Sequence, residues 1–321
     1  MNPPPPPAAR RTVAVIDVGS NTIKLLVARW APEGIERLHA RTLEARLGAG
    51  LGRDRPRLAP DRLTRGTDAV RTLAAEARAH GAQATAVVAT SAVRDAENGP
   101  EFAAAVASST GLRLRILSGT DEARLIGRGL RCDPALAAAP DLALFDLGGG
   151  SLEALEFRGP EVRCALSLPL GCVRLTERFL ADPALPLPHN VRAEIARHAT
   201  LVATEAGLAR EAFRGLPVAA TGGTVSTARA MAAAATGTSL EDSSPEIPVA
   251  LLRELLERVG PLSLVERQSL PGLSAARADV FPAALATLLA MADLTGCTAF
   301  RHSWYSLRHG VAAELFEGRG P

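Results

Sequence analysis

Three glycine-rich segments follow apolar runs, and each has the residue types that can hold a phosphate group. They are Gly19-Ser20-Asn21, Gly148-Gly149-Gly150-Ser151 and Gly222-Gly223-Thr224. Because glycine has no Cβ, the backbone N–H groups of such a loop can close on phosphate oxygens. The third segment also precedes a predicted helix, whose N-terminus attracts anions. One loop of this kind is a weak signal, but three together predict a phosphate-binding site.

Three carboxylates accompany the first two loops. Asp17 and Asp146 stand just before them, and Glu153 follows the second. Mg²⁺ prefers oxygen ligands and bridges to substrate phosphates, so carboxylates beside a phosphate loop suit a magnesium site. The alternative is that Asp17 and Asp146 only form hydrogen bonds within their own turns. Residue type and spacing leave both interpretations open.

Two charged residues lie where a predicted strand passes into a predicted helix. Glu122 follows Gly119 by three residues, and hydrolysis of a phosphoanhydride needs a base that orients and deprotonates water. The alternative for Glu122 is that it only interacts favourably with the helix dipole. Arg94 follows another strand end and has the planar guanidinium that binds phosphate oxygens, although it could equally be a surface charge.

An internal repeat places the first two loops in the same setting. Residues 13–16 and 142–145 are apolar runs that lead into Asp, an apolar residue and Gly, about 129 residues apart. A second apolar run follows each loop, at 23–28 and 152–157. The pattern predicts a strand–loop–strand hairpin in each copy. Strand and helix patterns alternate along the rest of the chain, which indicates an α/β fold.

Composition narrows the classes of protein that fit. The chain has 321 residues, 47% hydrophobic and 22% charged, as in globular proteins of about two domains. A net charge of +2 argues against nucleic-acid binding, and no apolar run reaches the roughly 18 residues of a membrane span. The four cysteines lack zinc spacing, and the proline-rich residues 1–10 lack a secretion signal. We expect a cytoplasmic protein with reduced thiols and a disordered tail at 1–10.

Together, these motifs resemble the Ppx/GppA phosphatases, which are exopolyphosphatases and guanosine pentaphosphate phosphohydrolases of the actin/sugar-kinase/Hsp70 superfamily. The matching segments are residues 17–22, 90–98, 118–125, 146–153, 168–171, 221–224 and 306–310. The resemblance implies two actin-like (ribonuclease H-like) α/β domains with the substrate in a cleft between them. We assign residues 11–129 to the first domain and 130–321 to the second, with the last helix able to pack on the first.

The resemblance also implies roles for individual residues. Glu122 would be the catalytic base, with Asp121 where the family usually has Glu. Asp146 and Glu153 would help to hold Mg²⁺, and Asp17 is the third candidate ligand. The residues expected to bind substrate phosphates are Ser20, Asn21, Arg94, Gly148, Gly149, Gly150, Ser151, Gly222, Gly223 and Thr224. His309 stands where the family usually has Glu, which leaves the role of that position open.

The predicted activity is hydrolysis of the terminal phosphoanhydride of inorganic polyphosphate, with release of orthophosphate. Guanosine pentaphosphate is the alternative substrate, and a non-catalytic sensor of polyphosphate or an alarmone is the alternative function. A sugar kinase or actin-like ATPase is disfavoured because no segment can be assigned to adenine or to a sugar hydroxyl. A long substrate would favour a basic track, for which Arg267, Arg277 and Arg308 are candidates. A homodimer is expected by family analogy alone.

Overall fold

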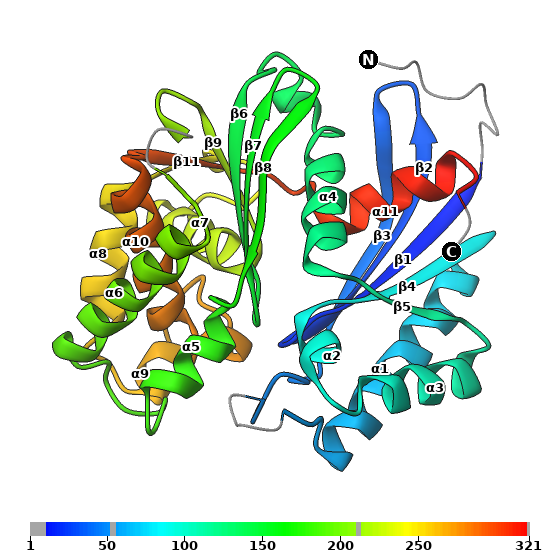
Figure 1. Cartoon of the computed structure of the whole chain (residues 1–321), viewed down its shortest axis with the longest axis horizontal. Helices are drawn as coiled ribbons and strands as arrows, with labels where there is room; N and C mark the ends of the chain where they lie inside the picture. The colour runs from blue at the N-terminus through cyan, green and yellow to red at the C-terminus, as the bar shows by residue number, and fades with distance from the viewer. Residues whose placement is uncertain (1–10, 52–55, 210–212, 320–321) are drawn as a thin grey trace. The chain divides into compact units, whose positions relative to one another are not determined.

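The chain forms two compact units in a computed structural model that describes residues 11–51, 56–209 and 213–319 (Figure 1). The first unit consists of the chain up to Ala138 together with the C-terminal segment from Tyr305. The second unit is Ala139–Trp304. The sequence prediction divides the chain after residue 129 and assigns the C-terminal segment to the second domain, with the last helix able to pack on the first. The predicted tail at 1–10 lies outside the described residues.

The sheet of the first unit has the strand order β3-β2-β1-β4-β5. Its strands are β1 (Thr12–Val18), β2 (Thr22–Ala31), β3 (Gly34–Glu44), β4 (Ala84–Ala89) and β5 (Leu114–Ile116). The first three strands form the predicted hairpin and its antiparallel extension, while β4 runs parallel to β1 and β5 parallel to β4. The carboxyl ends of β1, β4 and β5 therefore meet at one edge, where ligands bind in open α/β sheets.

Helices cover both faces of this sheet, as the apolar runs of β1 and β2 require. The helical elements are α1 (Pro60–Ala79), α2 (Ser91–Asp95), α3 (Gly99–Thr110), α4 (Gly119–Leu130), the 3₁₀ helix η1 (Pro134–Leu136) and α11 (Leu307–Phe316). α11 packs on α4 and β1. The two helices approach closely because a Cβ on Gly310 would lie 1.8 Å from the carbonyl oxygen of Leu125. This contact is why the C-terminal segment belongs to the first unit.

The second unit repeats the strand plan of the first. Its sheet order is β10-β11-β9-β6-β7-β8, from the strands β6 (Leu142–Leu147), β7 (Leu152–Arg158), β8 (Glu161–Leu168), β9 (Val218–Thr221), β10 (Glu246–Pro248) and β11 (Ala299–His302). Again three antiparallel strands are followed by two parallel ones, β9 and β11, and β10 is added at the edge. The internal repeat in the sequence thus corresponds to a repeated topology.

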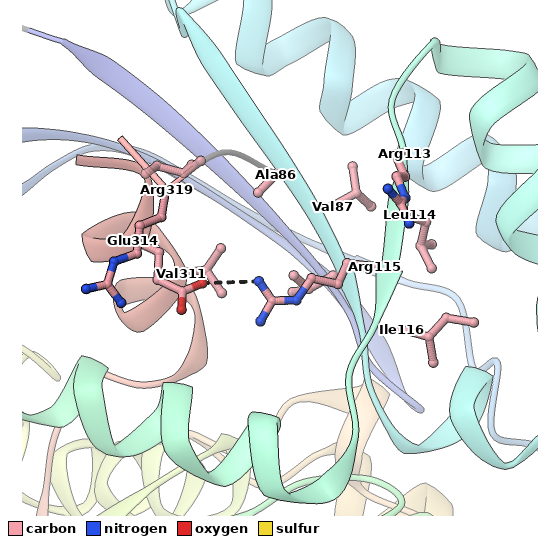
Figure 2. A pocket seen from close by; sticks show the side chains of 11 residues that line it. Ala86, Val87, Arg113, Leu114, Arg115, Ile116, Val311, Glu314 and Arg319 are labelled. Carbon is pink, nitrogen blue, oxygen red and sulfur yellow. Dashed lines mark hydrogen bonds and ion pairs between the residues drawn. The ribbon is translucent and has the colours of Figure 1, made fainter. Parts of the chain in front are cut away.

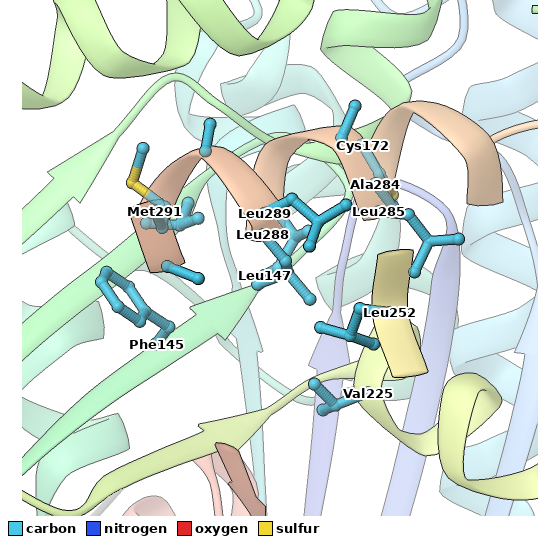
Figure 3. Close-up of a cluster of buried hydrophobic side chains, with 14 of the residues drawn as sticks. Phe145, Leu147, Cys172, Val225, Leu252, Ala284, Leu285, Leu288, Leu289 and Met291 are labelled. Carbon is cyan, nitrogen blue, oxygen red and sulfur yellow. The ribbon is translucent and has the colours of Figure 1, made fainter. Parts of the chain in front are cut away.

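The helices of the second unit enclose one apolar helix. They are α5 (Cys172–Phe179), α6 (His189–Glu205), α7 (Gly223–Thr236), α8 (Val249–Val259), α9 (Leu264–Gln268), the 3₁₀ helix η3 (Ala275–Arg277) and α10 (Phe281–Thr295). α10 is buried on every side, as an apolar helix at the centre of a core must be. Figure 3 shows Leu288 and Leu289 of α10 beside Leu147 of β6. This packing fixes the strand that leads into the second glycine loop.

The described part of the chain holds no helix with both the length and the apolarity needed to cross a bilayer.

Candidate active site

The first glycine loop joins β1 to β2 in a tight turn. Gly19 N donates to the carbonyl oxygen of Thr22 at 3.2 Å. Ser20 and Asn21 are buried, and the Ser20 Oγ lies 3.1 Å from the Ser91 Oγ at the start of α2. Gly48 packs directly on this turn, because a Cβ there would lie 2.8 Å from the Ser20 Cβ. Ser20 is thus positioned by Ser91 and by Gly48, of which the sequence motifs include only Ser91.

Asp17, at the end of β1, has an oxygen that lacks a partner. Its Oδ1 is buried and forms no hydrogen bond with the described residues. Burial raises the pKa of the Asp17 carboxyl, whereas Lys24 and Arg308 act to lower it. The interpretation that Asp17 only satisfies its own turn therefore does not account for Oδ1. A buried acceptor without a partner is suited to a cation or a bound water.

Glu122 and Arg94 form an ion pair in which Glu122 is buried and Arg94 is partly buried. Glu122 lies in the first turn of α4 and is only 5% exposed. Arg94, in the last turn of α2, donates from Nη1 to the Glu122 Oε2 at 2.7 Å and to the carbonyl oxygen of Leu117 at 3.1 Å. Neither residue is a solvated surface charge. The pair lies at the edge where β4 and β5 end, so it shares that edge with the first glycine loop.

In the second glycine loop, the carbonyl groups of the three glycines are turned to α5. The carbonyl oxygens of Gly148 and Gly149 accept from the backbone N–H groups of Cys172 and Val173, and that of Gly150 accepts from the Arg174 Nε. The C=O and N–H of a trans peptide point in opposite directions. The N–H groups of Gly149, Gly150 and Ser151 therefore point away from α5, together, as an anion-binding nest requires.

Gly171 allows this arrangement, since a Cβ at that position would lie 2.3 Å from the carbonyl carbon of Gly149. This close approach explains the glycine that ends the sequence motif at 168–171.

Asp146 and Glu153 lie directly opposite each other on β6 and β7. Such pairs project from one face of a sheet with their Cβ atoms about 5 Å apart. Both are buried, and the Ser167 Oγ donates to the Glu153 Oε1 at 2.8 Å. No three His, Cys, Asp or Glu side chains form a metal-binding group within the described residues. Two adjacent carboxylates nevertheless fit Mg²⁺, which usually keeps several waters and takes phosphate oxygens as further ligands.

The third glycine loop leads from β9 into α7. Gly222 has a φ of +96°, in the region that favours glycine. The Thr221 Oγ1 is buried and has no hydrogen-bond partner among the described residues. Because Asp146 and Thr221 are partners on the parallel strands β6 and β9, the second and third loops emerge side by side.

Arg277 lies against the N-terminus of α7. A Cβ on Gly223 would come within 1.7 Å of the Arg277 Cζ, so only glycine leaves room for the guanidinium. α7 has no acid in its first turn. A cation beside the positive end of a helix dipole is unfavourable unless an anion joins it. The arrangement is therefore suited to a phosphate.

The prediction that Arg267 belongs to a basic track for the substrate is wrong. Its side chain is fully buried and donates to the carbonyl oxygens of Ala278, Pro183 and Leu185, so it cannot face a substrate. Arg308 donates to the carbonyl oxygen of Leu25 and is partly buried. Arg277 is the candidate that lies at a glycine loop.

His309 has a structural role at the start of α11. Ser306 caps this helix, and its backbone N–H donates to the His309 Nδ1 at 3.4 Å in a capping box. Burial lowers the pKa of His309 to about 3, and Arg308 and Arg37 act in the same direction. A neutral imidazole can accept this hydrogen bond. In a capping box, the side chain of Glu or Gln is the usual acceptor.

The chain is similar to proteins of known family and structure. The profile of the Ppx/GppA phosphatase family matches residues 26–317. An exopolyphosphatase from Cytophaga hutchinsonii is similar in structure with a TM-score of 0.87 at 22% identity, over 97% of this chain and 100% of that one.

Two further structures are similar over nearly their whole lengths. An exopolyphosphatase-like protein has a TM-score of 0.81 at 25% identity, over 96% of this chain and 99% of that one. A PPX-GPPA enzyme from Aquifex aeolicus has a TM-score of 0.73 at 22% identity, over 95% and 99%. The predicted fold class of two actin-like α/β domains is confirmed.

Proposed function

Since the chain belongs to the Ppx/GppA phosphatase family, and is thus a phosphoanhydride hydrolase, we propose that it removes the terminal phosphate of inorganic polyphosphate. The observation that carries the proposal is the buried Glu122, held by Arg94 at the edge where the parallel strands end. A protein that only binds polyphosphate has no use for a buried carboxylate beside its phosphate ligands. This argues against the sensor.

In the proposed reaction, a water oxygen attacks the terminal phosphorus and the bond from phosphorus to the bridging oxygen breaks. The proton of the water passes to the Glu122 carboxylate, and the shortened polyphosphate leaves with the bridging oxygen. Arg94 already holds Glu122 in place and can bind a phosphoryl oxygen through its other guanidinium nitrogens. Orthophosphate is the second product.

The phosphates are bound by the glycine loops in this proposal. The N–H groups of Gly149, Gly150 and Ser151 donate to phosphate oxygens, and the first turn of α7 with Arg277 binds a further phosphate. Asp146 and Glu153 would hold Mg²⁺, and the free Oδ1 of Asp17 makes it the third proposed ligand. When bound, Mg²⁺ would neutralise charge on the phosphate oxygens.

Two considerations favour polyphosphate over guanosine pentaphosphate. The groups described above are proposed to bind phosphate, and none of them is suited to a guanine base. Two of the similar structures carry the name exopolyphosphatase or exopolyphosphatase-like. We place the reaction in the cytoplasm, where reducing conditions suit the four free cysteines.

The test is orthophosphate release from long-chain polyphosphate with Mg²⁺, with guanosine pentaphosphate as the parallel substrate and EDTA as the control. We expect release from polyphosphate that EDTA abolishes and a higher kcat/KM than for guanosine pentaphosphate. Binding of polyphosphate without release of orthophosphate would contradict the enzyme proposal and favour the sensor. A higher kcat/KM for guanosine pentaphosphate would make that compound the substrate instead of polyphosphate.

Gly223→Ala is expected to lower kcat/KM for polyphosphate about tenfold or more, or about 1.4 kcal/mol of barrier. The added methyl group would occupy the position of the Arg277 guanidinium, which is the flexible end of a side chain and can move without loss of the fold. Steady-state rates of Gly223→Ala, Arg277→Ala and the double variant measure the effect. If the methyl group acts by displacing Arg277, it costs little once Arg277 is absent. Additive losses would contradict this explanation.

A further inference from the structure

The first unit contains a pocket whose lining includes none of the glycine loops. It opens beside α11 over β4 and the edge strand β5, and its volume is about 450 Å³ (Figure 2). That volume lies within the range of small-molecule binding sites. The hydrolysis proposed above makes no use of this space.

The pocket has an apolar wall. Ala86 and Val88 of β4 are buried, but they lie outside the core beneath α1 and α3, so they face the side of the sheet that carries α11. Val311 and Leu315 of α11 also line the pocket. Ile116 of β5 is 36% exposed, whereas the other four side chains are already buried. An apolar part of a ligand would therefore gain mainly by covering Ile116.

The same pocket has an excess of positive charge. Arg113, Arg115 and Arg319 line it with a single acid, Glu314. Figure 2 shows the Arg115 guanidinium extended toward Glu314, at 3.1 Å. Arg319 pairs with the exposed Glu317 at 3.2 Å. Arg113 is exposed and has no ion pair or hydrogen bond with another described residue.

Glu314 has a second partner that would keep it satisfied if Arg115 turned to a ligand. Its other oxygen, Oε1, accepts from the Arg124 Nη2 of α4 at 3.2 Å. Loss of the contact from Arg115 would therefore not leave the buried Glu314 carboxylate without a charged neighbour. Arg113 directly precedes β5 and Arg115 is the middle residue of that strand, and both line the pocket.

We propose that this pocket binds a nucleotide, with its phosphate held by Arg113 and Arg115 and its base and sugar against the apolar wall. Guanidinium groups bind phosphate oxygens in pairs and stack on flat rings. Because Arg319 is paired with Glu317 and Arg115 with Glu314, Arg113 supplies the uncompensated positive charge that would attract a phosphate group. Polyphosphate itself has no apolar part and would leave the wall of the pocket uncovered.

The experiment measures AMP binding to the full chain by isothermal titration calorimetry. AMP has no phosphoanhydride, so the proposed hydrolysis cannot consume it, and absence of hydrolytic activity would not affect this test. We expect one site, weakened at least about fivefold in Arg113→Gln and strengthened in Glu314→Gln, which removes the acid that competes for Arg115. Adenosine, without the phosphate, should bind far more weakly.

Arg65→Gln is the matched control, because Arg65 is an exposed arginine of α1 in the same unit that does not line the pocket. It should leave AMP affinity unchanged. Photolabelling with 8-azido-AMP and peptide mapping should place the label within 113–116 or 311–319. No binding of AMP, equal affinity in Arg113→Gln, or label confined to 19–22, 148–151 or 222–224 would overturn the proposal.

Discussion

Glu122→Gln is expected to lower kcat for orthophosphate release from polyphosphate at least about a hundredfold, which corresponds to about 2.7 kcal/mol of barrier. The amide keeps the size of the side chain but cannot accept the proton of the attacking water. It can still accept a hydrogen bond from Arg94, so the junction between α2 and α4 should be retained. Steady-state phosphate release at saturating polyphosphate measures the loss.

Asp121→Asn is the matched control for this change. Asp121 is the neighbouring acid in the first turn of α4, but its side chain is 49% exposed and accepts from the Ser118 hydroxyl instead of from Arg94. Its replacement removes one negative charge from the same turn and should leave kcat within about twofold. Equal losses in both variants would show that the charge of the turn matters, and that Glu122 is not the base.

The effect of substitution on KM distinguishes the role of the proposed base Glu122 from that of its partner Arg94. Arg94→Gln should raise KM as well as lower kcat, since Arg94 is proposed to bind phosphate and to hold Glu122. Glu122→Gln should affect mainly kcat. A KM effect confined to Glu122→Gln would reverse the roles assigned to the two residues.

Local pattern was sufficient to predict the elements that carry the site. The apolar runs at 13–16 and 142–145 each end at an aspartate and a glycine turn, and both became a strand of a hairpin. The repeat also predicted that the two units share a topology. These features are encoded within about 20 residues of chain, where periodicity and turn residues are informative.

Contacts between distant segments could not be predicted in the same way. Neither Arg94 nor Glu122 can be identified as a site residue from its own sequence position with certainty, because each has a purely structural alternative. Their pairing depends on β4 and β5 being neighbouring strands. Arg267 and Arg277 look alike in the sequence, yet the first is buried among carbonyl groups and the second lies at the start of α7. Their surroundings come from segments up to 84 residues away.

The capping box at Ser306 was missed for a different reason. A serine followed three residues later by Glu or Gln is the usual signature, and His309 occupies that place here. The sequence prediction allows the last helix to pack on the first domain, and the structure adds the reason, since Gly129 and Gly310 let α11 approach α4 closely.

Acidification from pH 6.5 to 4.5 is expected to cost about 5 kcal/mol of unfolding free energy through two buried histidines. Burial lowers the pKa of His302 to about 4 and that of His309 to about 3, in each case with help from a neighbouring arginine. In the unfolded chain both titrate near 6.5. Below that pH the unfolded state binds protons that the folded state does not, so stability falls as pH decreases.

The magnitude follows from linkage. Each histidine contributes about 1.4 kcal/mol per pH unit between its unfolded and folded pKa values. The raised pKa of the Asp17 carboxyl acts in the opposite direction, because the folded state then binds the extra proton. Its contribution begins as the pH falls through the raised pKa of the folded state and is complete near the ordinary value of 3.8. The contribution of Asp17 is common to the wild type and the histidine variants, so comparison of their slopes isolates the histidines.

The two histidines belong to different units, and each unit has one tryptophan that can report on its unfolding. Trp30 packs edge-on against Phe316 in the first unit, and Trp304 lies against His302 in the second. Urea unfolding from pH 4.5 to 7, followed in Trp304→Phe and Trp30→Phe backgrounds, therefore reports on one unit at a time. His309→Gln should flatten the pH dependence of the Trp30 transition alone.

His302→Gln should flatten the pH dependence of the Trp304 transition in the same way. The exposed His189 supplies the control, and His189→Gln should leave both slopes unchanged. The glutamine in His309→Gln can also accept the capping hydrogen bond, so stability at pH 7 should stay near that of the wild type while the acid sensitivity of the first unit disappears. An unchanged slope in His309→Gln would mean that the imidazole is protonated in the fold, and the buried capping box would then need a counter-charge that no described neighbour provides.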